Sequence, residues 1–144
     1  MEKKEKTQKE TKKRKSIPKS KGPSSEDLAR LLAKAIDDKK GERIEILDLR
    51  GLTVWSDFFV IASGAVRIQI QAMAEETIRQ AKLGGTRNRS VEGLQDSDWI
   101  LVDFSDVVVH LMTHESRDFY RLEKLWGDAP KVKWNTETNE TEKE

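Results

Sequence analysis

Five consecutive residues at positions 58–62, FFVIA, are all apolar, and Ser63-Gly64 follows them directly. A short run rich in β-branched and aromatic residues predicts a strand that is covered on both faces, because a solvent-facing side would show polar residues at alternate positions. Such a strand requires further layers above and below its sheet. The run therefore restricts the chain to a layered fold in which helices flank a sheet.

Two amphipathic segments supply covering layers. Ser24 or Ser25 can cap a helix whose apolar residues recur at helical spacing until Gly41 ends it. Positions 65–83 carry a second apolar stripe, which two glycines close. Each segment has one apolar side, so each is expected to pack against the sheet.

A third helix is expected further along the chain. Ser116 can act as its N-cap, and Gly127 marks its end. The apolar residues that we expect together on one side of this helix are Phe119, Leu122, Leu125 and Trp126.

Four more segments have strand character. Positions 43–49 contain an apolar alternation with a local shift, and positions 87–91 carry a weak strand signal. The segments DWILVDF and VVVHLM flank Ser105-Asp106, as the strands of a β-hairpin flank their turn. The order αββαβββα predicts an α/β fold, a single domain with a mixed sheet of about five strands flanked by helices.

Charge divides the chain into a basic N-terminal segment and an acidic body. Residues 1–25 hold 10 Lys or Arg and 3 Glu, a net charge of +7, and the total of +1 leaves −6 for residues 26–144. Both ends lack the apolar side chains that would offset the entropy cost of ordering. We expect a disordered basic tail over 1–24, a domain over 25–130 and a disordered polar tail over 131–144. The KKRK run of the basic tail contacts phosphates, resembles a nuclear signal, or only keeps the chain in solution.

Several kinds of site lack the residues that they need. The chain has no cysteine, which excludes disulfides, cysteine-based zinc sites and thiol catalysis. No apolar run of about 18 residues is present, and the N-terminal residues lack the apolar core of a signal peptide. We therefore expect a cytoplasmic protein without a membrane span.

The two histidines, His110 and His114, have the i, i+4 spacing that suits metal binding on a helix. Three valines before His110 favour a strand instead, in which such residues lie about 13 Å apart, too far to share one ion. A turn after Met112 could still fold His114 back toward His110. The simpler interpretation is a locally hydrogen-bonded His110 and an exposed loop residue His114, with no metal and no cofactor.

An enzymatic alternative rests on Ser63-Gly64, which lies between a strand and a helix, where backbone amides often hold phosphates. The dinucleotide and P-loop glycine patterns are absent. A nucleotidyltransferase-like reaction would need paired carboxylates about a dozen residues later, and Glu75-Glu76 are the only candidates. Neighbouring helical acids point about 100° apart and more often form a solvated face. A nucleotide-binding enzyme is therefore the alternative to a binding protein.

Carboxylates gather around the expected hairpin, together with one tryptophan, Trp99. They form either an acid–base pair or an acidic binding face, and no Lys, Ser or Thr nucleophile accompanies them at a telling spacing. Trp99 is either an interface anchor or a core residue. The carboxylates are Glu92, Asp96, Asp98, Asp103 and Asp106.

Four stretches of the chain resemble the ribosomal silencing factor family, known as RsfS or Iojap. They are DLRGLTVWSDFFVIASG, the helix at 69–81, EGLQDSDWILVDFSDVVVHLM and SRDFYRLEKLWGDAP, in the family's order. The resemblance implies a nucleotidyltransferase-like fold without catalytic activity. It also implies binding to the large ribosomal subunit through its protein numbered fourteen in the universal scheme. The bound factor would block subunit association and lower translation when nutrients are scarce, and could aid large-subunit assembly.

The resemblance also implies which residues meet the ribosomal protein. Trp99, in the family's DW pattern, is the expected central contact, and whether it shares a face with the DVVVH residues depends on the hairpin register. The expected partner-binding residues are Asp98, Trp99, Leu101, Asp103, Asp106, His110 and Met112. Four other family positions are interpreted mainly as scaffold: Asp57, Arg117, Tyr120 and Glu123.

Two features depart from the family pattern: Ser105 replaces a usual glycine, and Ala65-Val66-Arg67-Ile68 replaces small polar residues. The basic N-terminal tail also lies outside the pattern, and near a ribosome it would contact ribosomal RNA. Nothing in the sequence decides between a monomer and a homodimer.

Overall fold

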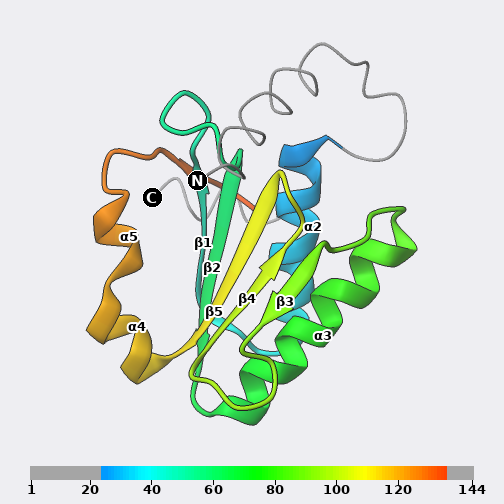
Figure 1. The fold of residues 1–144 in the computed structure, drawn as a ribbon, viewed down its shortest axis with the longest axis vertical. Coiled ribbons are helices and arrows are strands. Elements are labelled where there is room, and N and C mark those ends of the chain that lie inside the picture. Colours follow the sequence, from blue (N-terminus) through cyan, green and yellow to red (C-terminus); the bar gives the residue numbers. More distant parts are fainter. Residues whose placement is uncertain (1–23, 136–144) are drawn as a thin grey trace.

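The computed structural model describes residues 24–135 of the chain (Figure 1). The expected basic tail, apart from Ser24, and residues 136–144 of the expected polar tail lie outside the described residues. Within the described part, helices and strands form a mixed α/β fold, as the sequence predicts.

One sheet of six strands organises the fold, in the order β3-β4-β5-β2-β1-β6. The strands are β1 (Glu42–Asp48), β2 (Phe58–Gly64), β3 (Ser90–Glu92), β4 (Trp99–Asp103), β5 (Val107–Thr113) and β6 (Lys131–Val132). Only β2 and β5 run parallel, and all other neighbours are antiparallel. The apolar strand β2 lies inside the sheet, as its two-sided apolar character requires.

The strand count differs from the expected five because β6 pairs with β1. This two-residue strand lies beyond position 130, in the segment that we assigned to the polar tail, and Val132 and Trp134 pack against the core. The sheet domain therefore extends past its expected end. A strand of two residues has no periodicity from which it could be predicted.

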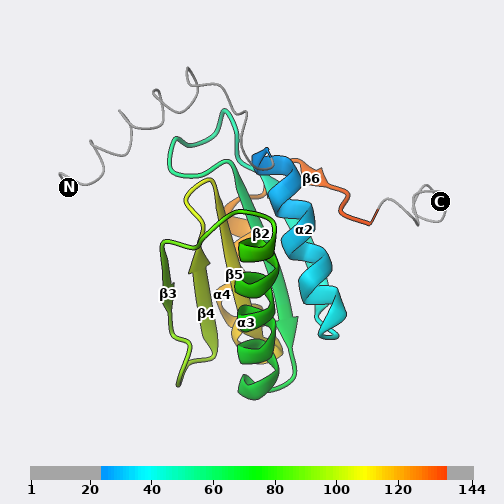
Figure 2. The ribbon, with the colours of Figure 1, turned by 90° about the vertical axis from the view of Figure 1, so that its right-hand side faces the viewer.

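Helices α2 (Ser25–Asp38) and α3 (Arg67–Leu83) cover one face of the sheet (Figure 2). Ser24 is the N-cap of α2, and its side chain accepts a hydrogen bond of 3.1 Å from the backbone N–H of Asp27. The buried stripes of both helices meet alternate residues of the central strands to form the main core. This face of the sheet is therefore covered by α2 and α3.

The other face carries only α4 (His114–Tyr120) and α5 (Leu122–Leu125), and here the expected third helix is wrong in three respects. The N-cap is Thr113, not Ser116, so His114 begins a helix and is not a loop residue. Arg121 adopts the left-handed conformation, with φ of 50°, and breaks the helix in two. The expected apolar side is therefore divided. Phe119 is 77% exposed and Leu125 is 76% exposed.

The turn between β4 and β5 contains a strained residue. Ser105 has φ of 79°, and its N–H donates a 2.7 Å hydrogen bond to Oδ1 of Asp103. A glycine is expected to tolerate this backbone conformation better, because it has no Cβ. Asp103, one of the expected partner contacts, therefore also closes the turn.

We predict that Ser105→Gly raises the free energy of unfolding by about 0.5–1 kcal/mol, because it removes the left-handed strain. Urea unfolding measures the change. Ser105→Ala keeps a Cβ and should show no such gain. A glycine variant less stable than the alanine variant would contradict this explanation of the turn.

Candidate docking face

The face of the sheet opposite α2 and α3, called here the open face, carries the residues that the sequence singled out. In β4, Ile100 and Val102 are buried in the main core, so Trp99 and its alternate neighbours point the other way. The register pairs Trp99 with Met112 and Leu101 with His110. Directly opposed residues of antiparallel strands project on the same side. The two sets of expected contacts therefore share one face.

Trp99 is held in place by a hydrogen bond to His110. The indole Nε1–H donates to Nδ1 of His110 over 3.1 Å, so this nitrogen is an acceptor and the imidazole proton lies on Nε2. Phe59 contacts the imidazole edge-on, with ring centroids 4.5 Å apart. The indole orientation is thus set by the sheet beneath it.

Burial keeps His110 neutral. The residue is 4% exposed, and desolvation lowers its pKa from 6.5 to about 4. Met112 is also fully buried beneath this face. In the unbound chain these two expected contacts therefore lie under the surface, and Trp99 with Leu101 forms the part that solvent reaches.

Helix α4 adds two aromatic side chains to this surface. The ring of Tyr120 lies 4.9 Å from that of Trp99, and Phe119 stands perpendicular to Tyr120 at the same centroid distance. Both residues are more than half exposed. The sequence favours a scaffold role for Tyr120 and places Phe119 on the apolar side of a single helix. The left-handed Arg121, which no helical periodicity signals, separates both rings from buried Leu122 in α5.

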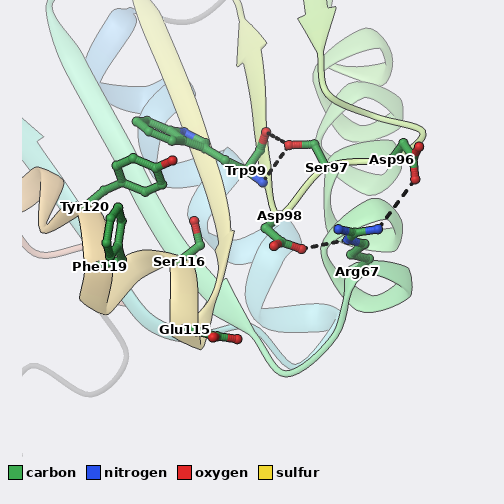
Figure 3. A pocket seen from close by; sticks show the side chains of 9 residues that line it. All are labelled: Arg67, Asp96, Ser97, Asp98, Trp99, Glu115, Ser116, Phe119 and Tyr120. Atoms are coloured by element: carbon green, nitrogen blue, oxygen red, sulfur yellow. Dashed lines mark hydrogen bonds and ion pairs between the residues drawn. The ribbon is translucent and has the colours of Figure 1, made fainter.

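A hollow of about 490 Å³ lies beside these rings, between α4, the start of α3 and the loop before β4 (Figure 3). Nε of Arg67 binds Oδ1 of Asp98 over 2.7 Å, and its Nη1 reaches Asp96 over 3.5 Å. Glu115 adds a third carboxylate, so the wall carries more negative than positive charge. The lining residues are Arg67, Asp96, Ser97, Asp98, Trp99, Glu115, Ser116, Phe119 and Tyr120.

The remaining expected contacts lie elsewhere on the hairpin. Leu101 is half-buried in the middle of β4, and Asp103 and Asp106 lie at the turn, at the opposite end of the hairpin from the hollow. The backbone carbonyl of Asp106 accepts hydrogen bonds from Ser56 and Asp57, which tie the turn to the start of β2. The structure thus gathers Trp99 and Asp98 at one end and separates them from these two aspartates.

Buried Arg117 fixes α4 to the sheet. Its side chain is fully buried; Nη1 donates to the carbonyl of Arg43 over 2.6 Å, and Nε donates to Glu123 over 3.2 Å. Arg43 lies in the bulge of β1, where φ is 51° and the pairing register shifts. Burial lowers the pKa of Arg117, and the charge of Glu123 opposes that shift. The scaffold interpretation holds for Arg117 and Glu123.

The residues of the enzymatic alternative have other partners. The side-chain oxygen of Gln69 accepts the N–H of Ala65 over 2.8 Å, which occupies a backbone amide directly after Ser63-Gly64. Glu76 is bound by Arg79 and Gln80. Neighbouring side chains thus engage a backbone amide at the position proposed for phosphate and one of the two carboxylates proposed for a metal, Glu76.

The histidine pair does not act as one unit, because His114 faces Glu42, with Nε2 and Oε1 3.1 Å apart, whereas His110 binds Trp99. Between residues 24 and 135 no group of three or more His, Asp or Glu side chains is arranged to hold a metal ion. In the same part of the chain no helix has the length and apolarity needed to cross a membrane.

Comparison of the sequence with known proteins shows the family of this chain. A family model described as "Ribosomal silencing factor during starvation" matches residues 22–144. The chain belongs to the ribosomal silencing factor family. The resemblance that the sequence motifs indicate is thus confirmed.

Relatives in this family come from bacteria and from chloroplasts. The ribosomal silencing factor RsfS of Halalkalibacterium halodurans is 41% identical over 109 residues, which are 76% of this chain and 93% of that protein. The chloroplast protein Iojap of Arabidopsis thaliana is 36% identical over 103 residues, which are 70% of this chain and 42% of that protein.

Two crystal structures share the fold. A protein of Chromobacterium violaceum matches with a TM-score of 0.71 and 34% identity over 73% of this chain and 88% of its own. A protein of Bacillus halodurans matches with a TM-score of 0.67 and 38% identity over 75% of this chain and 98% of its own. The mixed α/β architecture is therefore that of the ribosomal silencing factor family.

We predict that His110 makes the stability depend on pH below neutrality. Because the folded pKa is near 4, the unfolded state binds more protons between pH 6.5 and 4, so stability falls as pH falls through this range. His110→Gln should reduce the loss between pH 7 and pH 5 by about 2 kcal/mol, as measured by urea unfolding. An unchanged dependence in the His110 variant would refute the buried neutral imidazole.

We predict that Arg117→Met destabilises the chain by about 3 kcal/mol, because it removes the buried one of the two arginines that pair with Glu123 and leaves the carbonyl of Arg43 without its donor. The double variant Arg117→Met with Glu123→Leu should recover part of the loss. Thermal or urea unfolding measures both changes. Lys124→Met, at an exposed position of α5, is the control and should change little. A double variant no more stable than the single one would exclude the ion pair as the cause.

Proposed function

We propose that this chain represses translation by binding the large ribosomal subunit through its protein numbered fourteen. The bound chain blocks association with the small subunit, lowers translation when nutrients are scarce, and aids large-subunit assembly by the same contact. Family membership supports the translation-silencing role. The compartment proposed with this role is the cytoplasm, because the ribosomes on which the chain would act lie there.

The observation that carries the proposal is the partly exposed Trp99 on the open face, oriented by His110 and extended by Tyr120. Aromatic residues at the centre of an interface are common energetic hot spots, since they bury a large area with little loss of side-chain entropy. A residue held in place before binding loses less freedom when the partner arrives. The open face thus has the properties of a docking surface.

The negative charge of the chain around Trp99 indicates a basic partner. The residues after position 25 carry a net charge of −6, and the hollow beside Trp99 has three carboxylates against one arginine. An acidic rim around an aromatic centre complements a basic protein: the charges accelerate encounter and the aromatic side chain provides affinity. A ribosomal protein embedded in RNA fits this chemistry, whereas a free nucleotide phosphate would be repelled by the same carboxylates.

Silencing follows from mutual exclusion and needs no catalysis. If the chain and the small subunit cannot occupy the large subunit together, binding raises the apparent dissociation constant of the subunits by the factor 1 + [L]/Kd. At a free concentration of about 100 Kd, subunit association weakens about 100-fold. The level of repression is then set by the concentration of the chain and by its affinity for the large subunit.

We predict that wild-type chain co-sediments with isolated large subunits and not with small subunits, and that Trp99→Ala weakens this binding about 30-fold or more. Trp99→Phe keeps a ring but cannot donate to His110, so an intermediate loss is expected. Trp55→Ala is the matched control, because Trp55 is a partly exposed tryptophan in the loop between β1 and β2. Unfolding curves verify that each variant is folded.

Equal binding to both subunits would refute the proposal. Wild-type affinity of the Trp99→Ala variant would instead show that the docking surface lies elsewhere. The enzymatic alternative is tested by measuring the melting temperature of the chain with and without Mg²⁺ and a nucleotide. A ligand that binds only the folded state must raise the melting temperature.

A further inference from the structure

The last turn of α3 and the connection from it to β3, residues 82–89, carry three positively charged side chains, and this segment is called here the loop 82–89. Lys82, Arg87 and Arg89 are all exposed, and this eight-residue segment, KLGGTRNR, contains no acid. Among the residues that the structure describes, none forms an ion pair or a side-chain hydrogen bond with these three side chains. The loop is therefore a concentration of free cations on an otherwise acidic domain.

Backbone hydrogen bonds hold this loop in a defined shape. The N–H of Thr86 donates to the carbonyl of Ala81 over 2.8 Å, and Gly85 takes the positive φ of 96° that the turn requires. At the other end, the N–H of Arg89 donates to the carbonyl of Asp103 in β4 over 2.6 Å. The cations are thus attached to a backbone that is fixed at both ends, which lowers the entropy cost of binding an anion.

Other arginines in the region are already neutralised. Arg30 pairs with Glu26 over 2.7 Å, and Arg79 pairs with Glu76 over 2.9 Å. The arginines on the helices thus have carboxylate partners, whereas the cations of the loop have none among the described residues.

The loop lies at the same end of the molecule as the start of α2 (Figures 1 and 2). A Cβ added to Gly84 would lie 3.8 Å from a methyl carbon of Leu31, in the second turn of α2. The loop that follows α3 therefore lies close to the first turns of α2.

We propose that the loop 82–89 binds the phosphate backbone of RNA. An RNA strand is an extended polyanion, so its successive phosphates can contact the three cations of this segment together. Arginine forks suit phosphate oxygens, and the loop has no aromatic side chain to stack on bases, so binding is independent of base sequence. The inference rests on the proposed function in that ribosomal RNA supplies the phosphates.

The test uses the full chain and a fluorescent RNA duplex of about 20 base pairs, with binding followed by anisotropy at several salt concentrations. Each lost phosphate contact lowers the slope of log K against log[salt] by about 0.9, so Arg87→Gln with Arg89→Gln should lower it by about 1.8. The control is Lys39→Gln with Lys40→Gln, the same charge change at the far end of α2, and should leave the slope unchanged.

The inference is overturned if the loop variant keeps the wild-type slope, or if wild-type chain does not bind the duplex at low salt. A variant lacking residues 1–22 should retain a slope that the loop substitutions lower further, and loss of all binding in that variant would also count against the loop. The proposed function is judged separately with the isolated ribosomal protein. The loop variant should bind that protein like wild type. If wild-type chain does not bind the isolated ribosomal protein, the proposed function of the open face is contradicted, whereas the RNA binding of the loop is not.

Discussion

The pairing register of β4 with β5 decides what the open face presents. Ile100 and Val102 are fully buried against the helices, so their alternate neighbours Trp99 and Leu101 must project to the other side. A slip of one residue would place the indole in the main core and bring Ile100 to the surface. The burial that stabilises the fold therefore also fixes the position of the docking aromatic.

Local departures from ideal geometry shape the rest of this surface. The bulge in β1 offers the carbonyl of Arg43 to buried Arg117, which anchors α4. The left-handed Arg121 ends α4 one residue after Tyr120 and leaves that ring against Trp99. Two strained backbone positions and one buried cation thus assemble an aromatic surface from segments that are distant in sequence.

Much of the fold follows from residue patterns, and the site follows only in part. The apolar run of β2 and the stripes of α2 and α3 predict layers because burial repeats with the period of each element. The break at Arg121 depends on one backbone conformation, so periodicity assigned Phe119 to the wrong environment. Family motifs pointed to Trp99, but its hydrogen bond to His110 depends on the register, which only the three-dimensional pairing reveals.

The central claim is that a chain docked through Trp99 keeps the ribosomal subunits apart. Light scattering of purified subunits measures their association directly when the chain is added to large subunits before small subunits. We predict that wild-type chain suppresses the increase in scattering in a concentration-dependent way. The Trp99→Ala variant should need at least about 30 times the concentration for the same suppression. Full subunit association on large subunits saturated with wild-type chain would contradict it.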